Sequence, residues 1–294
     1  MPGFSIVTFN AAVQDVRLLG RSLYCPAACP AERLARVPRA LLDLDADIVC
    51  LQEVFHRGWR EWLCGALGRI YPHVAGLDSG WPGLRLGNEL LVLSRFPLSH
   101  ARLRRFKSAA PEELRFTSRG FQELSVHVPA LGEVLLCNVH ASAGGLDEHP
   151  ESPVMEEIRA RQIDELLQDR GQEKPLLLVG DLNAGPQSSV RNYRQLLAAG
   201  LVDACAAAGI RGVTWDPANP LVAAGREAHL PPQRIDHVFV NRGLAAQAAC
   251  SMAQIMLTER LVDSRQGRLP LSDHYAIRAE FRAVESVNAG APGG

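Results

Sequence analysis

The chain has 294 residues, of which 47% are hydrophobic, enough to bury one large core or two modest ones. Its 31 basic and 32 acidic side chains leave a formal net charge of −1, without the basic excess typical of proteins that hold long nucleic acids. No apolar run reaches the roughly 18 residues that a membrane-spanning helix needs.

The first part of the chain predicts strands and helices in alternation. Residues 4–9 alternate between apolar and polar side chains and predict a strand. Helical spacing over residues 31–44 predicts a helix that Pro38 kinks or restarts. The apolar run 47–51 predicts a short buried strand, and residues 59–67 predict an amphipathic helix.

Strands follow more densely after residue 88. Further helices are predicted at 154–167 and 190–199, and the predicted strands span residues 89–93, 121–128, 133–139, 175–179, 234–240, 255–257 and 274–281. Glycine- and proline-rich stretches at 80–87 and 216–232 predict loops. With no internal repeat and no linker, residues 1–285 predict one α/β domain of two packed sheets with helices outside, followed by a disordered tail at 286–294.

The seven cysteines are an odd number for a disulfide framework. Cys50 and Cys137 lie in apolar strand-like runs, where a free buried thiol is expected. Cys25 and Cys29 have no neighbouring histidine or cysteine pair, which argues against zinc. Together with the absence of a secretion signal, this favours a reducing, cytoplasmic location by default. A peripheral membrane or extracellular location applies if the chain is a mature fragment.

A basic cluster lies between two predicted strands. Two interpretations remain open for it: a solvated strand or loop face, or a rim that attracts an anionic substrate. Its members are Arg102, Arg104, Arg105, Lys107, Arg115 and Arg119.

Polar side chains interrupt the apolar pattern where six predicted strands begin or end. Strand ends that converge on one edge of a sheet sandwich form a cleft. The residues concerned are Asn10, Gln52, Glu53, Asn138, His140, Asp181, Asn183, Asp236, His237, Asp273 and His274.

These residues also have individual chemical interpretations. Glu53 directly follows a buried run, so its carboxylate needs a partner, either a hard cation such as Mg²⁺ or a salt bridge. Asp181 and Asn183, one residue apart, suit the holding of water or a phosphate oxygen, or else form an Asx turn. A histidine such as His274 works best when a carboxylate, for which Asp236 is a candidate, fixes its tautomer.

The sequence contains neither a Gly-x-Ser-x-Gly motif nor a phosphate-binding glycine-rich loop that ends in Lys-Ser/Thr. Metal-assisted attack by water is therefore preferred over a covalent route.

Six motifs resemble those of the endonuclease/exonuclease/phosphatase superfamily, in the order of that superfamily. They are Thr8-Phe9-Asn10, Leu51-Gln52-Glu53, Asn138-Val139-His140, Gly180-Asp181-Leu182-Asn183, Arg234-Ile235-Asp236 and Ser272-Asp273-His274. The resemblance implies a DNase-I-like, four-layered α/β sandwich with two packed, mostly antiparallel β-sheets flanked by helices.

The resemblance also implies roles for single residues. Glu53 would bind Mg²⁺, or Mn²⁺ or Co²⁺, with help from Asn10 and Asp273. Asp181 would orient or activate the attacking water, and Asn183 would hold the water or the phosphate. His274, held by Asp236, would act as acid/base or phosphate ligand, and His140 would contact the non-bridging oxygens.

Within the superfamily the chain is most similar to neutral sphingomyelinases. Leu51-Gln52-Glu53-Val54-Phe55 resembles their metal-binding segment, and His140 stands where AP endonucleases carry tyrosine. The resemblance implies a phospholipase C that cleaves sphingomyelin or a related phospholipid, with transient membrane contact. The alternatives are a Mg²⁺-dependent, DNase-like endonuclease or exonuclease, and an inositol-phosphate or other phosphoesterase.

Two features depart from the sphingomyelinase pattern. Ser142 replaces a second histidine, and the only candidate lipid-contacting loops are 81–84 and 220–222.

Overall fold

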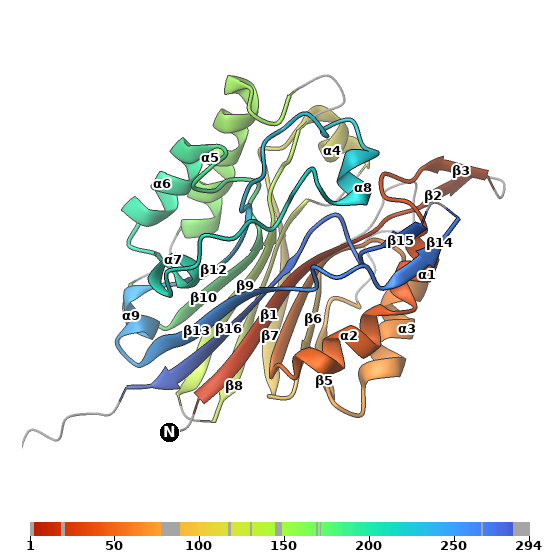
Figure 1. Ribbon diagram of the computed structural model, residues 1–294. Helices are drawn as coiled ribbons and strands as arrows, with labels where there is room; N and C mark the ends of the chain where they lie inside the picture. The colour runs from red at the N-terminus through yellow and green to blue at the C-terminus, as the bar shows by residue number, and fades with distance from the viewer. Residues whose placement is uncertain are drawn as a thin grey trace, which may run out of the picture.

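The structure is a computed structural model that describes residues 3–18, 21–77, 89–116, 119–129, 131–144, 149–168, 170, 172–265 and 267–284. Its frame is two six-stranded sheets packed face to face, with helices on both outer sides (Figure 1). The predicted loop 80–87 and the predicted tail 286–294 lie outside these residues.

The first sheet has β1 and β4 at its centre. Its strand order is β13 (Ala248–Met256), β16 (Ala276–Ala283), β1 (Gly3–Val13), β4 (Ile48–Val54), β6 (Leu91–Ser94) and β5 (His73–Ala75). Helices α1 (Pro30–Leu34), α2 (Val37–Leu44) and α3 (Arg57–Leu67) belong to the helical layer packed on this sheet.

The second sheet repeats this plan around β9 and β10. Its strand order is β11 (Val202–Asp203), β12 (Asp236–Val240), β10 (Leu176–Asp181), β9 (Gly132–His140), β8 (Gly120–Val128) and β7 (Leu98–Arg105). Helices α5 (Pro153–Leu167) and α6 (Val190–Ala198) cover its outer face.

Shorter elements connect these layers. The hairpins are β2 (Val16–Leu18) with β3 (Arg21–Tyr24), and β14 (Val262–Ser264) with β15 (Gly267–Leu269). The short helices are α4 (Pro111–Phe116), α7 (Ala204–Ala207), α8 (Pro220–Ala223) and α9 (Arg242–Ala245).

Each six-stranded sheet contains one parallel pair, β1 with β4 and β9 with β10. The other neighbouring pairs are antiparallel. Because the chain leaves both members of a parallel pair at the same edge, the ends of β1, β4, β9 and β10 define where a site can form. The predicted four-layered, mostly antiparallel sandwich is confirmed.

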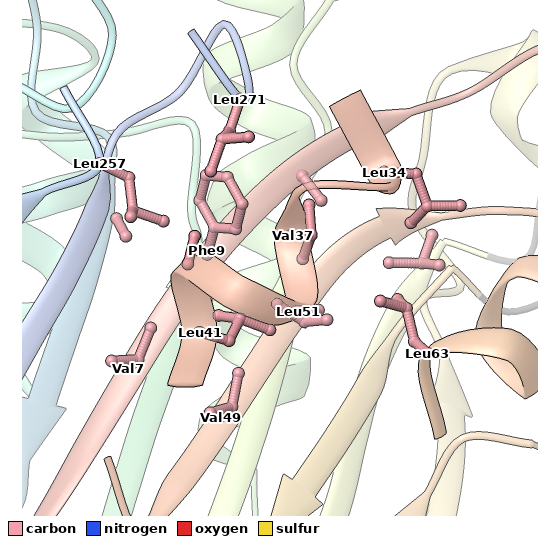
Figure 2. Packing of buried hydrophobic residues seen from close by; sticks show 14 of the residues in the cluster. Val7, Phe9, Leu34, Val37, Leu41, Val49, Leu51, Leu63, Leu257 and Leu271 are labelled. Carbon is pink, nitrogen blue, oxygen red and sulfur yellow. The ribbon is translucent and has the colours of Figure 1, made fainter. Parts of the chain in front are cut away.

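Three hydrophobic clusters separate the four layers. Alternation along β1 sends Phe4 and Ile6 between the sheets, while Val7 and Phe9 face the helices. Figure 2 shows this helix-side cluster, where Leu41 of α2 lies among side chains of β1 and β4. A third cluster joins the second sheet to α5 and α6.

Most predicted elements are present with shifted ends. The predicted helix 31–44 is interrupted between Leu34 and Val37, and Pro38 lies in the first turn of α2, where a missing N–H costs no helical hydrogen bond. The 255–257 strand is part of the longer β13. The basic cluster contributes Arg102, Arg104 and Arg105 to β7, an exposed edge strand, as the solvated-strand interpretation expected, whereas the Arg119 side chain is only 13% exposed and pairs with Glu89 and Glu113.

One prediction is wrong. Leu221 and Val222, proposed as part of a lipid-contacting loop, are each only 4% exposed, because Asn219 caps the short helix α8 that packs them into the hydrophobic clusters. The other candidate lipid loop, 81–84, lies outside the described residues.

Cys50 and Cys137 are buried free thiols, as predicted. Among the described helices, none is long and apolar enough to cross a bilayer.

Candidate active site

Alternation along the strands carries polar side chains into the space between the sheets. In β10, Leu177 and Val179 pack between the sheets, and Asp181 continues the same face at the end of the strand. In β9, Leu136 packs there and His140 continues that face. The register pairs Asp181 with His140 on one side and with Asp236 on the other. Sheet pairing therefore brings these groups to one edge.

Contacts from both sheets converge on the Asp181 carboxylate. Its Oδ2 lies 3.1 Å from Nδ2 of Asn10, 3.5 Å from Nε2 of His140 and 3.8 Å from Nε2 of His274. Glu53 joins the same group, with its Oε1 3.3 Å from Asn10 Nδ2 and 3.7 Å from His140 Nε2. Five of the eight predicted site residues thus lie together at the inter-sheet edge.

His274 is oriented by Asp236, as the sequence suggested. Its Nδ1 lies 2.8 Å from Oδ2 of Asp236, so the ring donates from Nδ1 and turns Nε2 toward Asp181. Burial lowers the pKa of His274, but the carboxylates of Asp236 and Asp181 outweigh it and raise that pKa well above its ordinary value. The arrangement favours an imidazolium at this position.

His140 has a carboxylate partner that the sequence analysis did not identify. Glu89, 3% exposed, places Oε1 3.0 Å from Nδ1 of His140. Arg119 donates to the same Glu89 oxygen at 3.0 Å and to Glu113 at 2.8 Å. Burial and Arg119 lower the pKa of His140, but the carboxylates of Glu89 and Asp181 outweigh them and raise that pKa above its ordinary value. An acid directly before an apolar run, at Glu89-Leu90, was the available signal.

Two site residues have left-handed backbones directly at strand ends. Glu53 has φ +57° and Asn183 has φ +48°, which asparagine tolerates and glutamate adopts at a cost. The Asn183 backbone N–H donates to Asp181 Oδ1 at 2.9 Å, so the predicted Asx turn is present. The turn carries Asn183 to the same edge, where its Nδ2 donates to Ala141 O at 3.0 Å.

Asp273 lies beside the group. The Ser272 hydroxyl donates to Asn10 O at 2.7 Å and lies 3.1 Å from Asp273 Oδ1, which fixes the segment that carries Asp273 and His274.

His237, by contrast, is not part of the cluster. It is fully buried, and its Nε2 lies 2.8 Å from Ala184 O, so it holds the loop after Asp181.

The donor set fits a hard divalent cation. Asp181, Asp236 and His274 offer atoms within 4.8 Å of one another, but a His274 ring that is protonated and bonded to Asp236 gives a cation no lone pair, which leaves the carboxylates as the donors. Asp236 Oδ1 is buried without a hydrogen-bond partner among the described residues, and burial raises the pKa of the Glu53 carboxyl. Buried carboxylates of this kind call for a cation. Asn10 turns its amide nitrogen to Glu53, so an oxygen ligand there requires the amide to flip.

The model of the endonuclease/exonuclease/phosphatase family matches residues 7–274, and the chain belongs to this family. It is a metal-dependent phosphodiesterase. No curated protein sequence matches the chain.

Solved structures share the fold at low identity. Sphingomyelinase C from Streptomyces griseocarneus is 21% identical, with a TM-score of 0.71 over 95% of this chain and 99% of that one. A beta-toxin variant from Staphylococcus aureus with bound magnesium ions is 16% identical, with a TM-score of 0.73 over 94% and 99%. Truncated TDP2 from Caenorhabditis elegans is 20% identical, with a TM-score of 0.66 over 95% and 97%.

Proposed function

We propose that the protein is a Mg²⁺-dependent, sphingomyelinase-type phospholipase C that cleaves sphingomyelin or a related phospholipid to ceramide and phosphocholine. The observation that carries the hydrolytic chemistry is the pair of imidazoles, His140 and His274, whose Nε2 atoms lie 3.5 and 3.8 Å from one oxygen of Asp181. The lipid assignment is supported by the likeness to a sphingomyelinase C over nearly the whole chain and by the net charge of −1.

The contacts of each residue indicate its role in the proposed reaction. Asp181 orients a water molecule for in-line attack on phosphorus and takes up its proton, and Asn183 helps hold that water or a phosphate oxygen. His274, oriented by Asp236, and His140, oriented by Glu89, donate from Nε2 to the oxygens on which negative charge builds.

Glu53 would hold the divalent ion, together with Asn10 and Asp273. When bound, the ion supplies Lewis-acid withdrawal of charge from a phosphate oxygen. Mn²⁺ or Co²⁺ in place of Mg²⁺ is compatible with the same oxygen-rich donor set. Residues 1–285 form the single catalytic unit of the proposal, with transient contact to a lipid surface during turnover.

One panel tests the substrate. Wild type and Asp181→Ala are incubated with sphingomyelin vesicles, plasmid DNA, RNA and inositol phosphates, each with Mg²⁺ or with chelator. We expect Mg²⁺-dependent release of phosphocholine from the vesicles, lost in Asp181→Ala and retained in Asp43→Ala, which changes an exposed acid paired with Arg39. Hydrolysis of another substrate class with vesicles left intact would refute the lipid assignment.

A nuclease is the second candidate. The likeness to the TDP2 structure favours it, and the near-neutral charge speaks against it. A nuclease that holds several phosphates loses affinity steeply as salt rises. Cleavage of DNA in the same panel, inhibited by moderate salt, would select this alternative.

A further inference from the structure

Among the described residues, the largest fully buried side chains are three arginines. Arg33 is 0% exposed, and Arg60 and Arg159 are each 1% exposed. Among the described residues, neither Arg33 nor Arg159 forms an ion pair with a carboxylate. Burying a guanidinium without a counterion is costly unless all its N–H groups are bonded. Their hydrogen bonds therefore show what these arginines stabilise.

Arg33 uses all five of its donors on backbone carbonyls. Its Nε donates to Ala28 O at 2.7 Å, and its Nη2 donates to Ala27 O at 3.2 Å. The remaining bonds go to Ala12 O at 2.7 Å, Ala11 O at 3.1 Å and Leu271 O at 2.8 Å.

Those last three carbonyls adjoin the active site. Ala11 and Ala12 directly follow Asn10, and Leu271 lies two residues before Asp273. Arg33 thus ties together the end of β1 and the segment before β16, which supply metal-site residues from opposite ends of the chain.

The other two arginines contact the remaining strand ends. Arg60 donates from Nη1 to Val54 O at 2.8 Å and to Phe55 O at 3.2 Å, directly after Glu53. Arg159 donates from Nη1 to Ser142 O at 3.0 Å, two residues after His140.

Arg159 also reaches two further loop groups. Its Nη1 donates to Ala143 O at 2.8 Å, and its Nη2 donates to Ser189 Oγ at 2.7 Å, in the loop that follows Asp181 and Asn183. Between them, the three arginines hold the backbone next to the ends of β1, β4 and β9.

The backbone at these ends explains why side-chain donors are needed there. Ala12 and Glu53 have left-handed φ of +49° and +57°, and the pairing of β1 with β4 shifts register between Asn10 and Val13. Carbonyls in such irregular stretches leave the sheet ladder, and when buried they need other donors. A guanidinium can bind several of them at once in a fixed geometry.

We propose that Arg33, assisted by Arg60 and Arg159, is a positioning residue for the metal site. It acts through the backbone and does not touch the phosphate. The inference rests on the proposed metal-assisted chemistry but not on the identity of the lipid. Its distinguishing consequence is that loss of Arg33 weakens metal binding beyond any general loss of stability.

The test compares Arg33→Met with Arg278→Met. Arg278 donates from Nε to Leu44 O at 2.8 Å, and its side chain is 16% exposed in the body of β16, so it is a matched arginine–carbonyl bond away from the strand ends. Calorimetry gives the Mn²⁺ dissociation constant, and urea unfolding gives stability. Turnover of bis(p-nitrophenyl) phosphate gives an activity independent of lipid.

We expect Arg33→Met to raise the Mn²⁺ dissociation constant about 10- to 100-fold, the range usual for residues that orient metal ligands. The Mn²⁺ dissociation constant of Arg278→Met should stay within about twofold of wild type, because the bond of Arg278 to Leu44 O orients no metal ligand. Wild-type Mn²⁺ affinity in a folded Arg33→Met would overturn the proposal.

If Arg33→Met does not fold, Arg33→Lys takes its place, since it keeps the charge but offers three donors instead of five. The same criterion then applies to it. If wild type itself binds no Mn²⁺, the proposed metal role of Glu53 fails, and turnover decides about Arg33: an unchanged kcat in the variant would refute positioning.

Discussion

His274 lies between two carboxylates, with Asp236 2.8 Å from its Nδ1 and Asp181 3.8 Å from its Nε2. Burial alone would lower its pKa, and Asp236 is the principal reason that the pKa is raised instead. The protonated ring therefore persists at pH values where a free imidazole, with a pKa of about 6.5, has lost its proton. If the ring donates a proton to the phosphate, catalytic activity falls as the pH rises through this raised pKa.

Asp236→Asn should lower the pKa of His274 and shift the alkaline limb of the kcat profile to lower pH. We also expect kcat at neutral pH to fall about 10- to 100-fold, as when the partner that orients a catalytic histidine is lost. The measurement is kcat against pH with bis(p-nitrophenyl) phosphate at saturating Mg²⁺. Asp263→Asn, at an 83% exposed side chain, serves as control. An alkaline limb that does not move would contradict the assignment.

Asp203 is a buried acid with a structural role. Its Oδ2 accepts from Tyr193 Oη at 2.9 Å and Arg234 Nη1 at 2.6 Å, and lies 3.1 Å from His237 Nδ1. Burial raises the pKa of Asp203, but its bonds to His237 and Arg234 outweigh burial and hold that pKa far below its usual range. Because the folded-state pKa is depressed, its stabilisation is complete above the unfolded value of about 3.9 and is lost as pH falls below it.

Asp203→Asn should therefore destabilise the fold by about 3–5 kcal/mol at pH 7, because it leaves Arg234 buried beside a neutral amide. Urea unfolding at pH 7 and at pH values below 4 measures the difference, which should shrink in acid. Asp164→Asn, at an exposed helix position, should change stability by less than about 0.5 kcal/mol. A difference that persists unchanged in acid would contradict this account.

At the scale of elements, Gly180 allows β9 and β10 to pair up to the site. Its φ is +131°, and a Cβ built there would lie 2.0 Å from Val139 O on the neighbouring strand. The close approach keeps Asp181 in register with His140. The motif Gly-Asp-Leu-Asn contains this glycine, but the reason that a glycine is required is the close approach of the neighbouring strand β9.

Gly180→Ala should thus destabilise the protein by about 3 kcal/mol, through backbone strain and displacement of β9. Gly65→Ala in α3, where no atom lies within 4 Å of the added Cβ, should instead stabilise by about 0.5–1 kcal/mol. Chemical denaturation of both variants is the measurement. Equal stability of Gly180→Ala and wild type would refute the strain.

The predicted strands and all four predicted helical segments are present, because periodicity is local. The edge strand β7 was not predicted, since its burial pattern is almost entirely exposed. The short hairpins and one-turn helices were missed for a different reason: they have too few residues to show a period.

At the scale of the whole molecule, the two sheets share a carboxylate-rich edge that a divalent ion would stabilise. Ligand binding to the folded state adds about 2.7 kcal/mol at a hundredfold excess over the dissociation constant. We expect Mg²⁺ or Mn²⁺ to raise the melting temperature and chelator to reverse the shift. Glu53→Gln should lose this response, whereas Glu61→Gln, an exposed helix position, should keep it. A full response in Glu53→Gln would exclude Glu53 as a ligand.

The sequence by itself determined the main strands and helices and the polar strand ends, because each depends on local alternation and local composition, and the resemblance of its motifs to a known superfamily implied the four layers. Only the tertiary structure decided the partners: Glu89 at His140, Arg119 behind Glu89, and Arg33 bonded to a carbonyl 238 residues away. Such contacts are set by sheet register and by which buried donors and acceptors remain to be satisfied. Both are properties of the assembled layers, and no short stretch of chain contains them.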